Sequence, residues 1–184
     1  ALLEALFAEL SAQIPPAPTD ARLGQWQWLA QDGSLFRALP RMVWALYGGG
    51  KAGAPNRAAR LHLSLHVFED KPVRATLRPG RECERAVWEQ QWEPGAGYIA
   101  DRYFGENYQL FAKLERQGSP FVIRLRDQAV VNVEEELPLS AEDRAAGVVR
   151  QAWARLGCRP RYRSLRVRVV WIEHQGEPLL LVTN

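Results

Sequence analysis

The order of strands and helices along residues 60–125 most narrows the folds open to this chain. Residues 60–68 alternate apolar and polar side chains, as a strand in a sheet does. The segments that follow are predicted as a paired strand over 73–77, a helix over 81–92, a strand over 97–101, a helix over 106–117 that Gly118 ends, and a strand over 121–125. This order predicts an α/β fold, with helices packed on a sheet.

The flanking segments differ from this central part. Residues 2–13 are amphipathic and predict a helix, and the prolines that follow make a short linker. Residues 25–32 predict a strand rich in tryptophan, and the apolar residues 34–47 are predicted to be partly helical. The last third predicts strands over 129–137, 147–156, 162–174 and 178–183, although 147–156 fits a short helix equally well.

Composition sets wide limits on function. The chain has 184 residues, a net charge of +3 and a pI near 9.1, which is compatible with a polyanionic partner. Its basic residues are nearly all arginine, which suits bidentate contacts to phosphate, although codon bias in the source genome predicts the same excess. Cys83 and Cys158 match no metal-binding spacing. No membrane span or signal peptide is apparent, so we expect a cytoplasmic protein without a membrane partner.

Two aspartates stand where chemistry is expected. Asp101 directly follows the predicted strand, and carboxylates at such strand ends are common sites of chemistry in open α/β sheets. Asp32 closes the predicted strand over 25–32. Together their oxygens would suit a divalent metal. Taken singly, Asp32 also fits a turn or cap ahead of Gly33, and Asp101 a cap for the following helix.

Several segments, in this order, resemble bacterial DDE transposases of the insertion-sequence-four type. They are Asp32–Ser34, Ala38–Leu46, Arg60–Leu63, Tyr98–Tyr103, Phe121–Arg126 and Leu179–Asn184. The family's second acid usually precedes Arg-Gly-Tyr, whereas here the glycine is displaced to Gly105. The resemblance implies a ribonuclease H-like mixed sheet with flanking helices, plus a mostly-β insertion subdomain. It divides the chain into an upstream helix and linker (1–20), the first part of the core (21–126) and the insertion (127–184).

The same resemblance implies a DNA transposase that cleaves and transfers strands at transposon ends by two-metal phosphoryl transfer. Asp32 and Asp101 would be the first two catalytic and metal-binding acids, brought together on neighbouring strands, with Mg²⁺ as the metal and Mn²⁺ as an alternative. The third acid belongs to a later motif, and Glu173 in Trp171–Glu173 mimics it within a strand of the insertion. We expect the real glutamate beyond residue 184, and therefore a fragment that is inactive alone.

The partner implied is double-stranded DNA, as transposon ends and target, with a homodimer in the DNA complex and a place at the bacterial nucleoid. Candidate DNA contacts are Arg102, Arg161, Arg163, Arg166, Arg168 and Trp171, although the arginines also fit a solvated strand face. His62 and His66 lie on one strand face with Ser64 between them, which favours a structural role over metal binding. Two other functions stay open: an inactive transposase-derived DNA-binding remnant, and a ribonuclease H-like nuclease that hydrolyses without joining.

Overall fold

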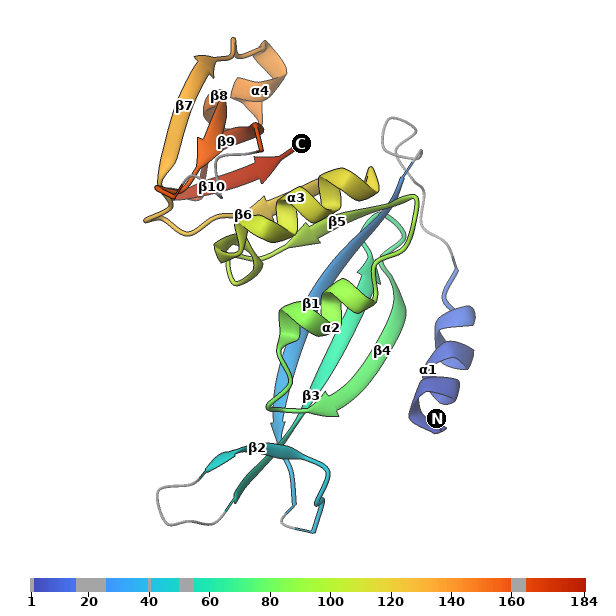
Figure 1. Cartoon of the computed structure of the whole chain (residues 1–184). Coiled ribbons are helices and arrows are strands. Elements are labelled where there is room, and N and C mark those ends of the chain that lie inside the picture. The colour runs from blue at the N-terminus through green and yellow to red at the C-terminus, as the bar shows by residue number, and fades with distance from the viewer. Residues whose placement is uncertain (1, 16–25, 40, 50–54, 160–164) are drawn as a thin grey trace. The chain divides into compact units, whose positions relative to one another are not determined.

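The computed structural model describes residues 2–15, 26–39, 41–49, 55–159 and 165–184. The chain forms two compact units, Ala1–Glu93 and Pro94–Asn184, called unit 1 and unit 2 below. Both units combine strands with helices (Figure 1), so the predicted mixed α/β class is confirmed. The proposed division into core and insertion stays a prediction.

Unit 1 is built on three long antiparallel strands, β1 (Gln27–Arg37), β3 (Pro55–His66) and β4 (Lys71–Pro79). β3 lies in the middle and pairs with both β1 and β4. The hairpin predicted between residues 60–68 and 73–77 is therefore confirmed. Helix α1 (Leu2–Ala12), also as predicted, lies against β4. Helix α2 (Glu84–Gln90) lies across one face of the strands (Figure 1).

The polar face of β3, rather than its leucine face, is the buried one. His62, Ser64 and His66 are buried, whereas Leu61 and Leu63 on the other face are half-buried. α2 covers the polar face with Val87 and Trp88, whereas the side chain of Ala86 is exposed.

Side chains from several elements of unit 1 form hydrogen bonds with polar groups on this face. The side chain of Gln91, at the C-terminus of α2, accepts a hydrogen bond from Gln31 on β1 and donates one to Thr76 on β4. The Ser64 hydroxyl donates to Gln31 at 3.4 Å. The burial of polar groups is tolerated because partners within the unit replace water.

The expected helix within residues 34–47 is wrong. β1 continues to Arg37, and after a turn the chain forms β2 (Leu46–Gly49), which pairs with the start of β3. The turn is tied to β3 because Ala38 N donates to the Arg57 carbonyl and Ala58 N donates to the Ala45 carbonyl. An apolar run without helical periodicity fits a strand as readily as a helix, and here the pairing with β3 decides.

Unit 2 begins with a strand–helix–strand motif. β5 (Ala96–Ala100) and β6 (Phe121–Arg124) are parallel neighbours, and α3 (Tyr108–Gln117) connects them. Asn107 caps the start of α3 by accepting a hydrogen bond from Gln109 N, and Gly118 ends the helix in the left-handed conformation at φ 73°. Phe111 of α3 stacks on Phe121 of β6 with ring centroids 5.3 Å apart. All these elements were predicted.

The rest of unit 2 extends that sheet with antiparallel strands. In spatial order after β6 come β10 (Glu177–Thr183), β9 (Val167–His174), β8 (Val148–Leu156) and β7 (Val131–Glu136). Strands form in all four predicted segments, although β9 begins only at Val167 and residues 162–164 lie outside the described part of the chain. The helical alternative for residues 147–156 is wrong. A short helix, α4 (Ala141–Ala145), begins at a capping box formed by Ser140 and Asp143.

Candidate active site

Asp32 lies inside β1, not at its end as predicted. It pairs in register with Leu63 of β3, and the strand continues for five more residues to Arg37. Its side chain is exposed, on the face of the sheet that carries Leu61 and Leu63. The Asp-Gly sequence suggested a turn, but here continued pairing with β3 keeps the chain extended.

The next residue, Gly33, faces the opposite side of β1 and lies against a buried carboxylate. A Cβ atom at Gly33 would collide with the side chain of Glu84, the first residue of α2. Glu84 is buried and forms an ion pair with Arg60. Because side chains alternate along a strand, Glu84 and Asp32 are on opposite faces and do not form one acidic site.

Asp101 occupies the predicted position directly after β5, and its carboxylate is exposed. Its Oδ1 accepts a hydrogen bond from Tyr103 N at 2.9 Å, and its carbonyl accepts one from Phe104 N at 3.2 Å. Asp101 therefore also stabilises the turn that leads into the 3-10 helix Phe104–Glu106. The alternative that Asp101 caps the following helix is wrong, because Asn107 caps α3 and Asp101 holds the turn before it.

The displaced glycine has a packing reason. Gly105 is buried, and a Cβ atom there would collide with the carbonyl oxygen of Arg124 on β6. The turn after Asp101 therefore packs directly on the backbone of the parallel neighbour, which only glycine permits at this distance.

A polar hollow of about 280 Å³ lies in the same part of unit 2. Arg102, Arg126, Asp127 and Gln128 line it. Arg126 forms an ion pair with Glu106, and the guanidinium groups of Arg102 and Arg126 suit phosphate oxygens. Arg126 did not stand out in the sequence because it directly follows a predicted strand of mostly buried residues.

Asp32 belongs to unit 1 and Asp101 to unit 2, so their predicted proximity stays a prediction. Among the described residues, no group of three or more His, Cys, Asp or Glu side chains is arranged to hold a metal ion. Carboxylate oxygens on two exposed aspartates nevertheless match the hard ligands that Mg²⁺ takes from proteins.

Glu173 lies in β9, as predicted, and its side chain is exposed. Its backbone N donates to the Gly147 carbonyl at 2.8 Å. It lines a second, more apolar hollow of about 310 Å³ together with Trp171, Ile172, Leu179 and Asp127. Glu173 is therefore part of the sheet that forms unit 2.

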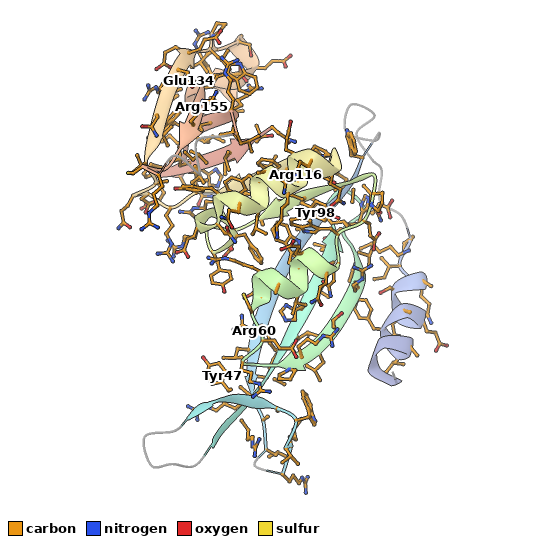
Figure 2. The ribbon with its side chains drawn as sticks, viewed as in Figure 1. Tyr47, Arg60, Tyr98, Arg116, Glu134 and Arg155 are labelled. Carbon is orange, nitrogen blue, oxygen red and sulfur yellow. The ribbon has the colours of Figure 1, made fainter. Side chains whose placement is uncertain are left out.

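The candidate DNA contacts have varied surroundings, and Figure 2 labels Glu134, an acidic partner of Arg166. Arg166 pairs with Glu134 at 3.3 Å and with Glu135 on β7, and its guanidinium lies 5.0 Å from the Trp153 ring centroid. Arg168 donates to Gln151. Trp171 has the Arg150 guanidinium 4.5 Å from its ring centroid. Arg161 and Arg163 lie outside the described residues.

His62 and His66 are buried side chains of unit 1. Neither ring nitrogen of His62 has a hydrogen-bond partner in the described part of the chain. Burial, with Arg60 and Arg78 nearby, lowers the pKa of His62 to about 4, so the imidazole is neutral at pH 7. His66 Nδ1 accepts a hydrogen bond from Glu69 N at 3.2 Å, which gives it a structural role in the turn after β3.

The similarity of this chain to known proteins is distant. No family model matches the chain, and no curated protein matches it. A solved structure, the cryo-EM piggyBac transposase synaptic complex with hairpin DNA, aligns with a TM-score of 0.44 and 11% identity over 85% of this chain. The chain spans about a third of that protein's length, 33%. A similarity at this level does not establish a shared fold. None of the helices in the described ranges has the length and apolar character needed to cross a membrane.

Proposed function

We propose that this chain is a catalytic-domain segment of a DNA transposase, of the bacterial DDE type, with a ribonuclease H-like core. The observation that carries the proposal is the position of Asp101. It follows β5 in a parallel β5–α3–β6 motif, where α/β sheets commonly place catalytic groups. The antiparallel β1–β3–β4 group, with an exposed acid on β1, precedes that motif in the chain, as the proposed core requires.

The proposed chemistry is phosphoryl transfer on DNA. Asp32 and Asp101 would hold divalent metal, Mg²⁺ or Mn²⁺, through carboxylate oxygens. When bound, a pair of such ions activates the attacking hydroxyl and stabilises the leaving oxygen. The hydrogen bond from Tyr103 N orients the Asp101 carboxylate, which would hold the metal in that orientation. Arg102 and Arg126, in the polar hollow, would bind backbone phosphates.

One observation favours a second candidate, a DNA-binding protein without activity. The bond from Tyr103 N gives Asp101 a structural reason to be present even without metal. The two candidates predict different results for substitutions that keep this bond.

The test is strand cleavage by the product of the complete gene on a duplex that carries the transposon ends. We expect Mg²⁺-dependent cleavage and strand transfer, with a loss of at least about a hundredfold in Asp32→Asn and in Asp101→Asn. The asparagine at 101 keeps an oxygen for Tyr103 N, so circular dichroism should show an unchanged fold. Glu173→Gln is the matched control and should cleave normally.

Several results would count against this proposal. Undiminished cleavage by folded Asp101→Asn protein would remove its chemical basis. DNA binding without metal-dependent cleavage would favour the inactive remnant. Cleavage without joined products would favour a nuclease that hydrolyses alone.

A further inference from the structure

We infer that the end of unit 1 formed by the last residues of β1, the turn that follows and β2 is a DNA-binding surface. This surface, called the tip below, consists of residues 35–39 and 41–47. The inference rests on the proposed function for the choice of DNA as the polyanion, but it does not depend on catalysis by Asp32 or Asp101.

The first observation is a group of exposed apolar side chains. Phe36 is 51% exposed, Val43 69% and Trp44 45%, although each belongs to an ordered turn or strand. The other exposed apolar residues of the tip are Leu35, Leu39 and Tyr47. Figure 2 labels Tyr47 at this end of unit 1. Such a concentration of exposed aromatic and aliphatic side chains usually marks a binding surface.

The backbone of the tip is well anchored, so this exposure is not that of an unfolded loop. Ala45 is fully buried, and Ala58 N donates to its carbonyl at 2.9 Å. Arg57 Nη1 donates to the Val43 carbonyl at 2.8 Å. Met42 N donates to the Leu39 carbonyl at 2.9 Å. These bonds satisfy the turn internally while Val43 and Trp44 face solvent.

Charge identifies the class of partner. Residues 33–68 contain no Asp or Glu, yet they include Arg37, Arg41, Lys51, Arg57 and Arg60. Arg37 and Arg41 belong to the tip and are exposed. Arginines beside exposed aromatic rings are the combination that binds nucleic acid, with guanidinium groups on phosphates and rings stacked on bases. An acidic protein would also complement the positive charge, but it would not offer bases on which the exposed aromatic rings can stack.

The first residues of the tip and Asp32 lie on the same strand, β1. Asp32, Ser34 and Phe36 alternate onto the same face of β1, because their partners on β3 are Leu63, Leu61 and Ala59. Phe36 lies four positions after Asp32 along the strand, a distance of about 13 Å, which is a few nucleotides of DNA. DNA held at the tip would therefore be able to reach the predicted catalytic carboxylate of the same strand.

The proposed ligand is DNA whose bases are open to stacking, either as a single strand or as a distorted duplex. The test is fluorescence anisotropy with a labelled single-stranded 20-mer and the corresponding duplex, over a range of salt. We expect the double variant Phe36→Ala/Trp44→Ala to bind about tenfold more weakly or worse. Trp44→Phe keeps a ring and should retain most of the affinity.

Arginine substitutions test the phosphate contacts. Arg41→Ala should reduce the slope of log affinity against log salt by about 0.7 on the single strand. Arg116→Ala, an exposed arginine of α3 (labelled in Figure 2), is the matched control for charge and should leave that slope unchanged. All these positions are exposed, so thermal melting followed by circular dichroism should be unchanged.

Wild-type affinity in the Phe36→Ala/Trp44→Ala variant would overturn the inference. So would tip-dependent binding to phosphatidylserine vesicles in place of DNA, or a dimer that the double variant dissociates without any change in DNA affinity. The proposed function fails separately, if Asp32→Asn and Asp101→Asn leave cleavage intact while the tip variants lose DNA binding.

Discussion

His62 places a pH-sensitive group in the interior of unit 1. It is 1% exposed, without a partner for either ring nitrogen among the described residues, and its pKa is lowered to about 4 by burial and by Arg60 and Arg78. Glu84 of α2 and its partner Arg60 lie on the same face of the sheet. Because protonation is harder in the folded state, His62 makes folding depend on pH.

The direction follows from the lowered pKa. In the unfolded chain the pKa of His62 is about 6.5, and above this pH the neutral imidazole does not oppose folding. As the pH falls from about 6.5 towards 4, the unfolded chain binds the proton more readily than the folded one, and the folded state loses stability. We expect the free energy of unfolding to fall by up to about 3 kcal/mol over that range through this group. Urea unfolding at a series of pH values measures it. His62→Gln should flatten the curve, while the exposed His174→Gln should not; an unchanged curve in His62→Gln would contradict the assignment.

At this scale, the sequence located Asp101 correctly because a strand of apolar residues ends there, and strand ends are marked by composition. It did not locate Asp32, since Asp-Gly-Ser has the composition of a turn and only pairing with β3 keeps it extended. The Glu84–Arg60 pair beneath Gly33 was also missed, because nothing local links residues that far apart in the chain.

Among the elements, α3 depends most clearly on one residue. Gly118 ends it at φ 73°, and a Cβ atom there would meet no heavy atom within 4 Å. Gly118→Ala should therefore destabilise unit 2 by about 1 kcal/mol through backbone strain alone. Gly118→Asn should cost less, since asparagine tolerates this conformation better. Urea unfolding measures the stability lost in each variant. Equal losses in Gly118→Ala and Gly118→Asn would show that the left-handed conformation does not determine the effect of substitution at this position.

Elements with local signals were predicted and those fixed by tertiary pairing were not. α3 and the β5–α3–β6 order follow from the periodicity of residues 106–117 and from Gly118. The turn and strand within residues 34–47 depend on backbone bonds to β3, such as the one from Ala38 to Arg57, which the sequence does not reveal.

The edge strand β7 supplies Glu134 and Glu135 to Arg166, so the charge of that arginine is already partly compensated.

For the molecule as a whole, the proposed function requires that one residue of each unit bind the same metal. Unit 1 supplies Asp32 on the long strand β1, and unit 2 supplies Asp101 after β5. The sequence suggested the pair through a family resemblance rather than through spacing, because the two aspartates lie far apart in the chain. Their proximity is therefore the statement on which the proposed chemistry depends.

A crystal of this chain grown or soaked with millimolar Mn²⁺ tests that statement most directly, because anomalous scattering locates the ion independently of the protein model. The proposed function predicts an anomalous peak about 2.1 Å from a carboxylate oxygen of Asp32 and a similar distance from one of Asp101. The peak should be lost in Asp101→Asn crystals and retained in Glu173→Gln crystals. Carboxylates separated by more than about 10 Å, with no ion between them, would contradict the account.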